Sequence, residues 1–246
     1  MPLNVKNETA YSGMGNYSTD KLVKGLATIE SGFGYHNAGA LLSLDAGVYK
    51  ALDPSDADLK YAFGVLLEKA DARTSAVSAL VGVRGVFNLE FVYIPYYDEF
   101  AGDGTATEFT LSHRPQEGTV NVFVNGVKQA EGIDYTVDYL ESKIVFSTAP
   151  DAGAEIKVWY GSGVRHYRFN TQGFSAGEAI KKGSLALYDE TRLMAETEYT
   201  VDYTTGDITL NEAPSDYIDV YYITPDYELV LRNAEGQEIY VVNLRR

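Results

Sequence analysis

The sequence of 246 residues contains no cysteine. Disulfide bonds, thiolate nucleophiles and cysteine-ligated metal sites are therefore excluded, and the redox compartment cannot be inferred from the sequence. No apolar run approaches the roughly 20 residues that a membrane-spanning helix needs. The start of the chain also lacks the basic and apolar segments of a secretory signal. These absences predict a chain that folds in solution without covalent cross-links.

Basic residues are scarce as well. The 20 Lys and Arg residues face 35 Asp and Glu residues, which gives a formal net charge of −15. A surface of this sign repels nucleic acids and anionic membranes, so we expect neither as a partner. The sequence is rich in tyrosine, with 20 residues, and tyrosine suits half-buried strands and wet interfaces because it joins a large apolar ring to a polar tip. The composition favours a protein that acts by surface recognition or assembly.

Residues for catalysis are sparse and scattered. The only histidines, His36, His113 and His166, lie far apart in the sequence, and none has the spacing of a zinc-binding motif. The Gly-rich segments lack the lysine and following helix of a phosphate-binding loop. The acidic segment Asp98–Gly104 offers carboxylates to a hard cation, but it departs from the spacing of a calcium loop. We therefore expect no catalytic residue, cofactor or metal site, and interpret the chain as a binding or structural protein, not an enzyme.

Short apolar runs and turn signals predict a mainly β fold. In the first half, runs typical of strands occupy residues 40–44, 48–52, 62–67 and 80–86, separated by segments rich in Asp, Gly and Pro. The polar segment 68–78 between the last two runs is expected to carry a short helical turn. Pro95 cannot donate a hydrogen bond to a sheet, and acidic residues follow it, so we place the end of this domain at residue 97.

The second half contains an internal repeat with a constant shift of 64 residues. Residues 134–139 (DYTVDY) match 198–203 (EYTVDY), and an Ala-Pro pair follows each copy at 149–150 and 213–214. Asp138 and Asp202 occupy equivalent positions in the two copies, so structural roles in turns suit them better than a shared acid–base role. Each copy is predicted to form a small β-sandwich-like module.

Turn chemistry distinguishes the two copies. In the first copy, Asn125 and Gly126 lie between alternating strands and predict a two-residue turn with positive φ angles. The second copy has Asp189 and Glu190 there, so its turn must be built differently. A further hairpin is predicted at the C-terminal end. The expected organisation is an extended N-terminal arm (1–25), a small β domain (26–97), module 1 (98–163), module 2 (164–225) and a C-terminal β-hairpin (226–246).

Residues 1–25 are rich in Asn, Ser, Thr and Gly and show no sustained period. Two interpretations remain open: a disordered terminus, or an arm that orders on a partner by adding a strand to a sheet edge.

Several short phrases between Gly39 and Asn88 occur in an order and spacing that resemble the lambda-type bacteriophage head decoration proteins, which cement capsids. The phrases are Gly39–Ser43, Tyr49–Asp53, Ala62–Glu68, Ala70–Ala72 and Val81–Asn88. The later segments Asn125–Val127, Asp134–Val137 and Ala149–Pro150 resemble small β modules of phage virion proteins. The first resemblance covers about a fifth of the chain, and the residues after Val92 have no counterpart in the minimal family member.

The resemblance implies a function. In that family an N-terminal arm precedes a mostly β core, and three copies sit around a threefold position of the expanded shell. We therefore expect a homotrimeric decoration protein that binds the major capsid protein on the outer surface of the phage head, after synthesis in the host cytoplasm, and stabilises the shell. The resemblance also implies that the N-terminal arm binds the capsid, and we expect its contact residues to be Leu3, Asn4, Val5, Tyr11 and Tyr17. The alternative is a virion fibre or surface module that binds a host glycan or cell-surface receptor, since aromatic side chains stack on sugars.

Overall fold

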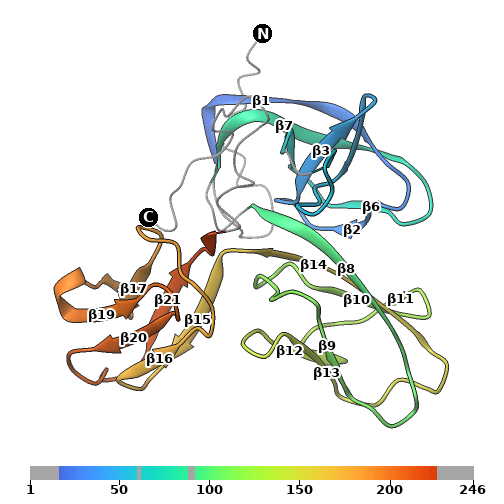
Figure 1. Ribbon diagram of the computed structural model, residues 1–246. Helices are drawn as coiled ribbons and strands as arrows, with labels where there is room; N and C mark the ends of the chain where they lie inside the picture. Colours follow the sequence, from blue (N-terminus) through green and yellow to red (C-terminus); the bar gives the residue numbers. More distant parts are fainter. Residues whose placement is uncertain (1–16, 60–61, 88–91, 226–246) are drawn as a thin grey trace.

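The computed structural model describes residues 17–59, 62–87 and 92–225 (Figure 1). Strands dominate these residues, which confirms the mainly β class; η1 (Glu196–Glu198) is a short 3-10 helix. The strands form a closed barrel followed by two modules of paired sheets. The predicted C-terminal hairpin at 226–246 lies outside the described residues.

The N-terminal body is a five-stranded barrel closed in the order β1-β4-β3-β5-β7. Side chains alternate between two cores, because neighbouring residues of a strand point to opposite faces. Leu42 and Leu66 enter one apolar cluster, while Leu41 and Val65 enter another. The barrel strands are β1 (Tyr17–Ile29), β3 (Leu41–Asp45), β4 (Val48–Ala51), β5 (Gly64–Leu66) and β7 (Val77–Phe87).

The strand runs predicted at 40–44, 48–52, 62–67 and 80–86 correspond to β3, β4, β5 and β7. The helical turn expected in residues 68–78 is wrong, because β6 (Ala70–Ala72) pairs there with β2 (Gly34–His36). Ala70 and Ala72 are buried and Asp71 between them is exposed. Alternation of buried and exposed residues is typical of a strand. The charged residues around this segment hide the alternation in the sequence.

Strand β1 corrects the predicted extent of the N-terminal arm. It begins at Tyr17 and pairs antiparallel with β7, so residues 17–25 belong to the barrel. The pairing register is irregular between Ser18 and Val23 and again between Val23 and Lys24. An irregular register breaks the alternation that marks a strand in the sequence, and this explains why the strand was not recognised.

The two modules share one topology, as the internal repeat predicts. Each combines a four-stranded sheet with a three-stranded sheet, in the orders β11-β10-β14-β8 and β12-β13-β9 for module 1, and β18-β17-β21-β15 and β19-β20-β16 for module 2. The repeated sequence YTVD forms β12 and β19 with the same burial pattern. The bounds in module 1 are β8 (Tyr93–Ala101), β9 (Glu108–Thr110), β10 (Asn121–Val124), β11 (Val127–Lys128), β12 (Tyr135–Asp138), β13 (Lys143–Phe146) and β14 (Glu155–Gly163). Those in module 2 are β15 (Arg165–Phe169), β16 (Gly173–Ser175), β17 (Ala186–Asp189), β18 (Arg192–Leu193), β19 (Tyr199–Asp202), β20 (Asp207–Leu210) and β21 (Ile218–Tyr222).

The domain end predicted at residue 97 falls inside a strand. β8 pairs with β14 along its whole length, from Tyr93 opposite Gly163 to Ala101 opposite Glu155, so residues 93–97 are part of the module 1 sheet. Pro95 is tolerated because β8 is the edge strand of that sheet. Only Val164 separates β14 from β15, so module 1 passes into module 2 almost without a linker.

The hairpin turns agree with the turn chemistry of the sequence. Asn125 and Gly126, between β10 and β11, both have positive φ angles, of 49° and 79°. This is the pattern expected of a primed two-residue turn. In the equivalent turn of module 2, Glu190 has a positive φ of 53°, whereas Thr191 does not. The second turn is therefore built differently, as predicted.

Candidate functional site

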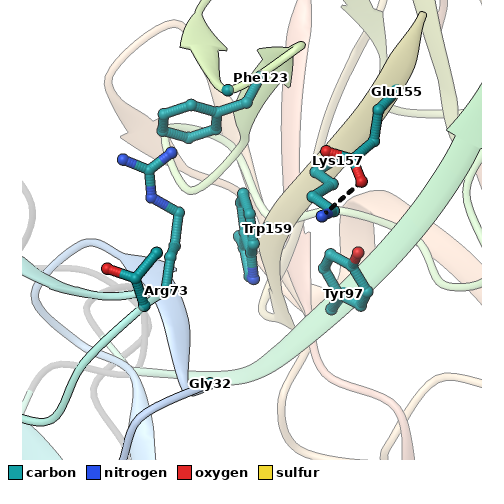
Figure 2. A pocket seen from close by; sticks show the side chains of 9 residues that line it. Gly32, Arg73, Tyr97, Phe123, Glu155, Lys157 and Trp159 are labelled. Carbon is teal, nitrogen blue, oxygen red and sulfur yellow. Dashed lines mark ion pairs between the residues drawn. The ribbon is translucent and has the colours of Figure 1, made fainter.

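A concave feature lies between the barrel and module 1 (Figure 2). It is an open groove of about 590 Å³, a size typical of sites for small ligands. The barrel contributes residues beside β2 and β6, and module 1 contributes the outer face of its four-stranded sheet. The lining residues are Gly32, Arg73 and Thr74 from the barrel side and Tyr97, Phe123, Gly126, Glu155, Lys157 and Trp159 from module 1.

An aromatic cluster forms the floor of the groove. Tyr35, Phe123 and Trp159 pack as one buried apolar group, with edge-on contacts of 5.2 Å from Tyr35 to Phe123 and 5.3 Å from Phe123 to Trp159 between ring centroids. The guanidinium of Arg73 lies 4.1 Å from the Phe123 ring centroid, a favourable cation–π geometry. Because Tyr35 and Arg73 come from the barrel, this cluster also fixes the barrel against module 1.

Ion pairs balance the charges at the groove. Arg73 donates two hydrogen bonds to Asp71, of 2.7 and 2.9 Å, and this pairing holds the pKa of Asp71 below its usual value. Lys157 lies 2.7 Å from a carboxylate oxygen of Glu155, a pair visible in Figure 2. Each of the two cations that line the groove is therefore paired with a carboxylate.

Tyr97 is the most exposed aromatic residue of the groove, at 43%. Its ring lies 5.2 Å from the Trp159 ring, centroid to centroid, and its hydroxyl donates a hydrogen bond to Glu99. Burial raises the pKa of Tyr97, and the neighbouring Glu99 raises it further. Tyr97 is therefore a neutral aromatic surface whose orientation is held from both ends.

One Ser, His and Asp set occurs elsewhere in module 1. Ser112 Oγ lies 2.8 Å from an Asp98 oxygen and 3.0 Å from His113 Nδ1, and Tyr160 donates to Asp98 at 2.7 Å. In a nucleophilic triad the carboxylate orients the histidine, and the histidine contacts the serine. Here the carboxylate holds the serine hydroxyl itself. The arrangement suits a bracing contact between β8 and the segment after β9.

The structure keeps the three histidines apart. His36 in β2 is buried, and burial lowers its pKa to about 3. His166 in β15 bridges Glu117 of module 1, at 2.7 Å, and Asp219 of β21, at 2.9 Å. Burial lowers the pKa of His166, but the two carboxylates outweigh it and the net pKa is raised.

A second polar network joins the two modules beside His166. The buried Arg165 donates to Glu178 at 2.9 Å, and Tyr222 donates to the same carboxylate oxygen at 2.9 Å. Arg114 of module 1 reaches across to donate to the carbonyl of Ala176 at 2.7 Å. Buried polar groups that are fully paired rigidify their surroundings, so this network holds the modules in a defined orientation.

The acidic residues considered for metal or acid–base roles are used by turns. Asp103 accepts hydrogen bonds from the backbone of Thr105 and Ala106. Asp138 and Asp202 cap equivalent turns in the two modules, each accepting from the backbone two and three residues later. Within residues 17–59, 62–87 and 92–225, no group of three or more His, Asp or Glu side chains is arranged to hold a metal ion.

The predicted binding residues of the arm are mostly beyond the described part of the chain. Leu3, Asn4, Val5 and Tyr11 precede it, and Tyr17 is the first residue of β1. The groove was not predicted, because its residues come from segments far apart in the sequence. The one signal in the sequence that points to it is the single tryptophan of the chain.

No protein-family model matches this sequence, and no curated protein is similar enough to count as a relative. In the described part of the chain, no helix is long and apolar enough to cross a membrane.

Proposed function

We propose that the chain is a phage head decoration protein that binds the outer surface of the expanded capsid, as trimers at threefold positions, and stabilises the shell. The major capsid protein is its partner. The physical basis is mass action: a ligand that binds only the expanded shell stabilises it, and many symmetric copies add up to a large effect.

The observation that supports this proposal best is where the family-like phrases lie. They cover β5 and β6, most of β3 and β4, and the second half of β7, whereas β1 lies outside them. They also supply its buried side chains, including Leu41, Leu52, Val65 and Val81. A resemblance confined to the N-terminal body is what a shared attachment domain with later additions would produce.

One side of the barrel, here called its free side, faces away from both modules. β1 runs over this side (Figure 1), and among the described residues it pairs with β7 and β4. On this part of the barrel Leu26 of β1 is 75% exposed and Val83 of β7 is 41% exposed. Exposed apolar side chains on adjacent strands suit contact with a protein surface, and the two modules would then project away from the shell.

Co-sedimentation of the full chain with undecorated capsids tests the proposal. We expect saturable binding to expanded capsids and none to unexpanded shells. A variant in which a Gly-Ser segment replaces residues 2–16 leaves β1 intact. We expect this variant not to attach, because a strand that the arm adds to a capsid sheet would lack the side chains that anchor it.

The matched control replaces exposed apolar residues of the modules, Val127→Ser together with Leu193→Ser, and should bind like the unmodified chain. Absence of binding to both kinds of shell would remove the proposal. Full binding by the Gly-Ser variant would instead move attachment from the arm to the barrel surface.

A further inference from the structure

We infer that the groove between the barrel and module 1 is a binding site for a neutral saccharide. This inference goes beyond capsid attachment and does not depend on it, because the groove and the free side of the barrel are built from different residues. It rests on three properties of the groove: a held aromatic surface, a surrounding set of paired charges, and open space at its two glycines.

The aromatic surface is the ring of Tyr97. It stands on the edge strand β8, is 43% exposed, and packs against Trp159, which is only 7% exposed. The hydrogen bond from its hydroxyl to Glu99 fixes the ring at the other end. A ring held in one orientation loses little conformational entropy when a flat, partly apolar ligand stacks on it. The CH face of a sugar ring is such a ligand.

The polar groups around Tyr97 supply both donors and acceptors. Lys157 and Glu155 lie side by side on β14, with side chains 31% and 48% exposed. Arg73 and Thr74 line the groove from the barrel side, and Figure 2 shows Arg73 there. Each hydroxyl of a sugar donates one hydrogen bond and accepts others, so neighbouring hydroxyls can bind a cation and a carboxylate together.

The balance of charge selects against other ligands. Both cations that line the groove are already paired with carboxylates, Arg73 with Asp71 and Lys157 with Glu155, which weakens their attraction for a phosphate or a carboxylate. The net charge of −15 also repels anions. A wholly apolar ligand would desolvate the Lys157 and Glu155 pair without replacing its contacts with water. A neutral molecule with one apolar face and many hydroxyls satisfies all of these conditions.

The groove has room at two glycines. A Cβ atom placed on Gly32 or on Gly126 would find no atom within 4 Å. Both glycines have positive φ angles, and both line the groove. Their backbone is therefore accessible to a ligand, and the volume of about 590 Å³ accommodates a ligand longer than the Tyr97 ring itself.

The single tryptophan of the chain makes the test specific to this site. The full chain is first applied to an array of neutral and acidic oligosaccharides. The neutral binder that gives the strongest signal is then titrated while the emission of Trp159 is followed. We expect a saturable change in emission, because the ligand covers the ring that packs on Trp159.

Substitutions assign the binding to the groove. Tyr97→Ala should weaken binding about tenfold or more, since it removes the stacking surface, and Tyr97→Phe should restore it by keeping the ring. Lys157→Gln should weaken binding independently of the aromatic surface. The control Tyr217→Ala removes a partly exposed tyrosine of module 2 and should bind like the unmodified chain.

Two results would overturn the inference: a folded chain that binds no neutral saccharide, or equal binding by the unmodified chain and both Tyr97→Ala and Lys157→Gln. A preference for acidic over neutral saccharides would also contradict it. Co-sedimentation of Tyr97→Ala with expanded capsids separates this site from the proposed function, because attachment should be unchanged in that variant whatever the saccharide result.

Discussion

A missing side chain at position 34 allows the barrel to approach module 1. A Cβ atom on Gly34 would lie 2.0 Å from the indole nitrogen of Trp159 and 2.2 Å from its neighbouring carbon. Gly34 also has a φ of 98°, which an L-residue adopts only with strain. Gly34→Ala should therefore lower the free energy of unfolding by about 2–4 kcal/mol, since steric overlap is added to backbone strain.

Gly32 provides the matched control for this prediction. Its φ is 91°, close to that of Gly34, but a Cβ there meets no atom within 4 Å. Gly32→Ala should cost only the backbone strain, about 1 kcal/mol. Denaturant unfolding followed by the emission of Trp159 measures both variants. If both variants lose the same free energy of unfolding, the Trp159 side chain must move away from the new Cβ atom at little cost. The close approach of Gly34 to Trp159 would then not limit stability.

At the scale of strands, the sequence predicts those elements whose signal lies in a short stretch of neighbouring residues, such as an alternating strand or a turn. Asn125 and Gly126 specified their hairpin turn because only residues that tolerate positive φ fit it. β1 was missed because its register shifts near Val23 interrupt the alternation. The groove could not be predicted, since Arg73 and Trp159 meet only when the barrel docks on module 1, and no local pattern encodes that contact.

The strand β15 carries a pH-sensitive contact between the modules. His166 stacks on Tyr221 with ring centroids 4.3 Å apart, and it bridges Glu117 and Asp219. Arg168 is the other charged group on Asp219. The pKa of His166 is raised above the ordinary value of 6.5 in the folded chain. Protonated His166 therefore contributes its full stabilisation below about pH 6.5, the pKa of histidine in the unfolded chain. This stabilisation is lost as the pH rises through the higher pKa that His166 has in the folded chain.

The variant His166→Phe isolates this effect, because it keeps a ring on Tyr221 but cannot be protonated. We expect the stability advantage of the unmodified chain over His166→Phe to decrease from mildly acidic to mildly alkaline pH. Denaturant unfolding at a series of pH values measures the difference in the free energy of unfolding between the two chains. His36 is present in both, so its contribution cancels, although its lowered pKa makes stability depend on pH in the opposite direction. A stability difference between the two chains that does not change with pH would show that protonation of His166 does not stabilise the fold.

Over the whole molecule, the apolar cores do not stop at the borders of the three bodies. One cluster joins Leu52 and Val65 of the barrel, Ile94 of β8, and Val164 and Ile223, which lie together at one end of the β15–β21 pair. Domains linked only by flexible segments unfold separately, whereas a shared apolar core couples them. The short β14–β15 connection and the Arg165 network act in the same direction.

We therefore expect the barrel and both modules to unfold in one transition. Ile208 lies in the core of module 2, is 1% exposed, and is far along the chain from Trp159 in module 1. Ile208→Ala should cost about 2–4 kcal/mol through loss of buried apolar surface. If the bodies are coupled, the transition reported by Trp159 emission shifts together with the one reported by circular dichroism. The opposite result is a Trp159 transition that stays in place while the circular dichroism transition splits in two. It would show that module 2 unfolds independently of the barrel and module 1.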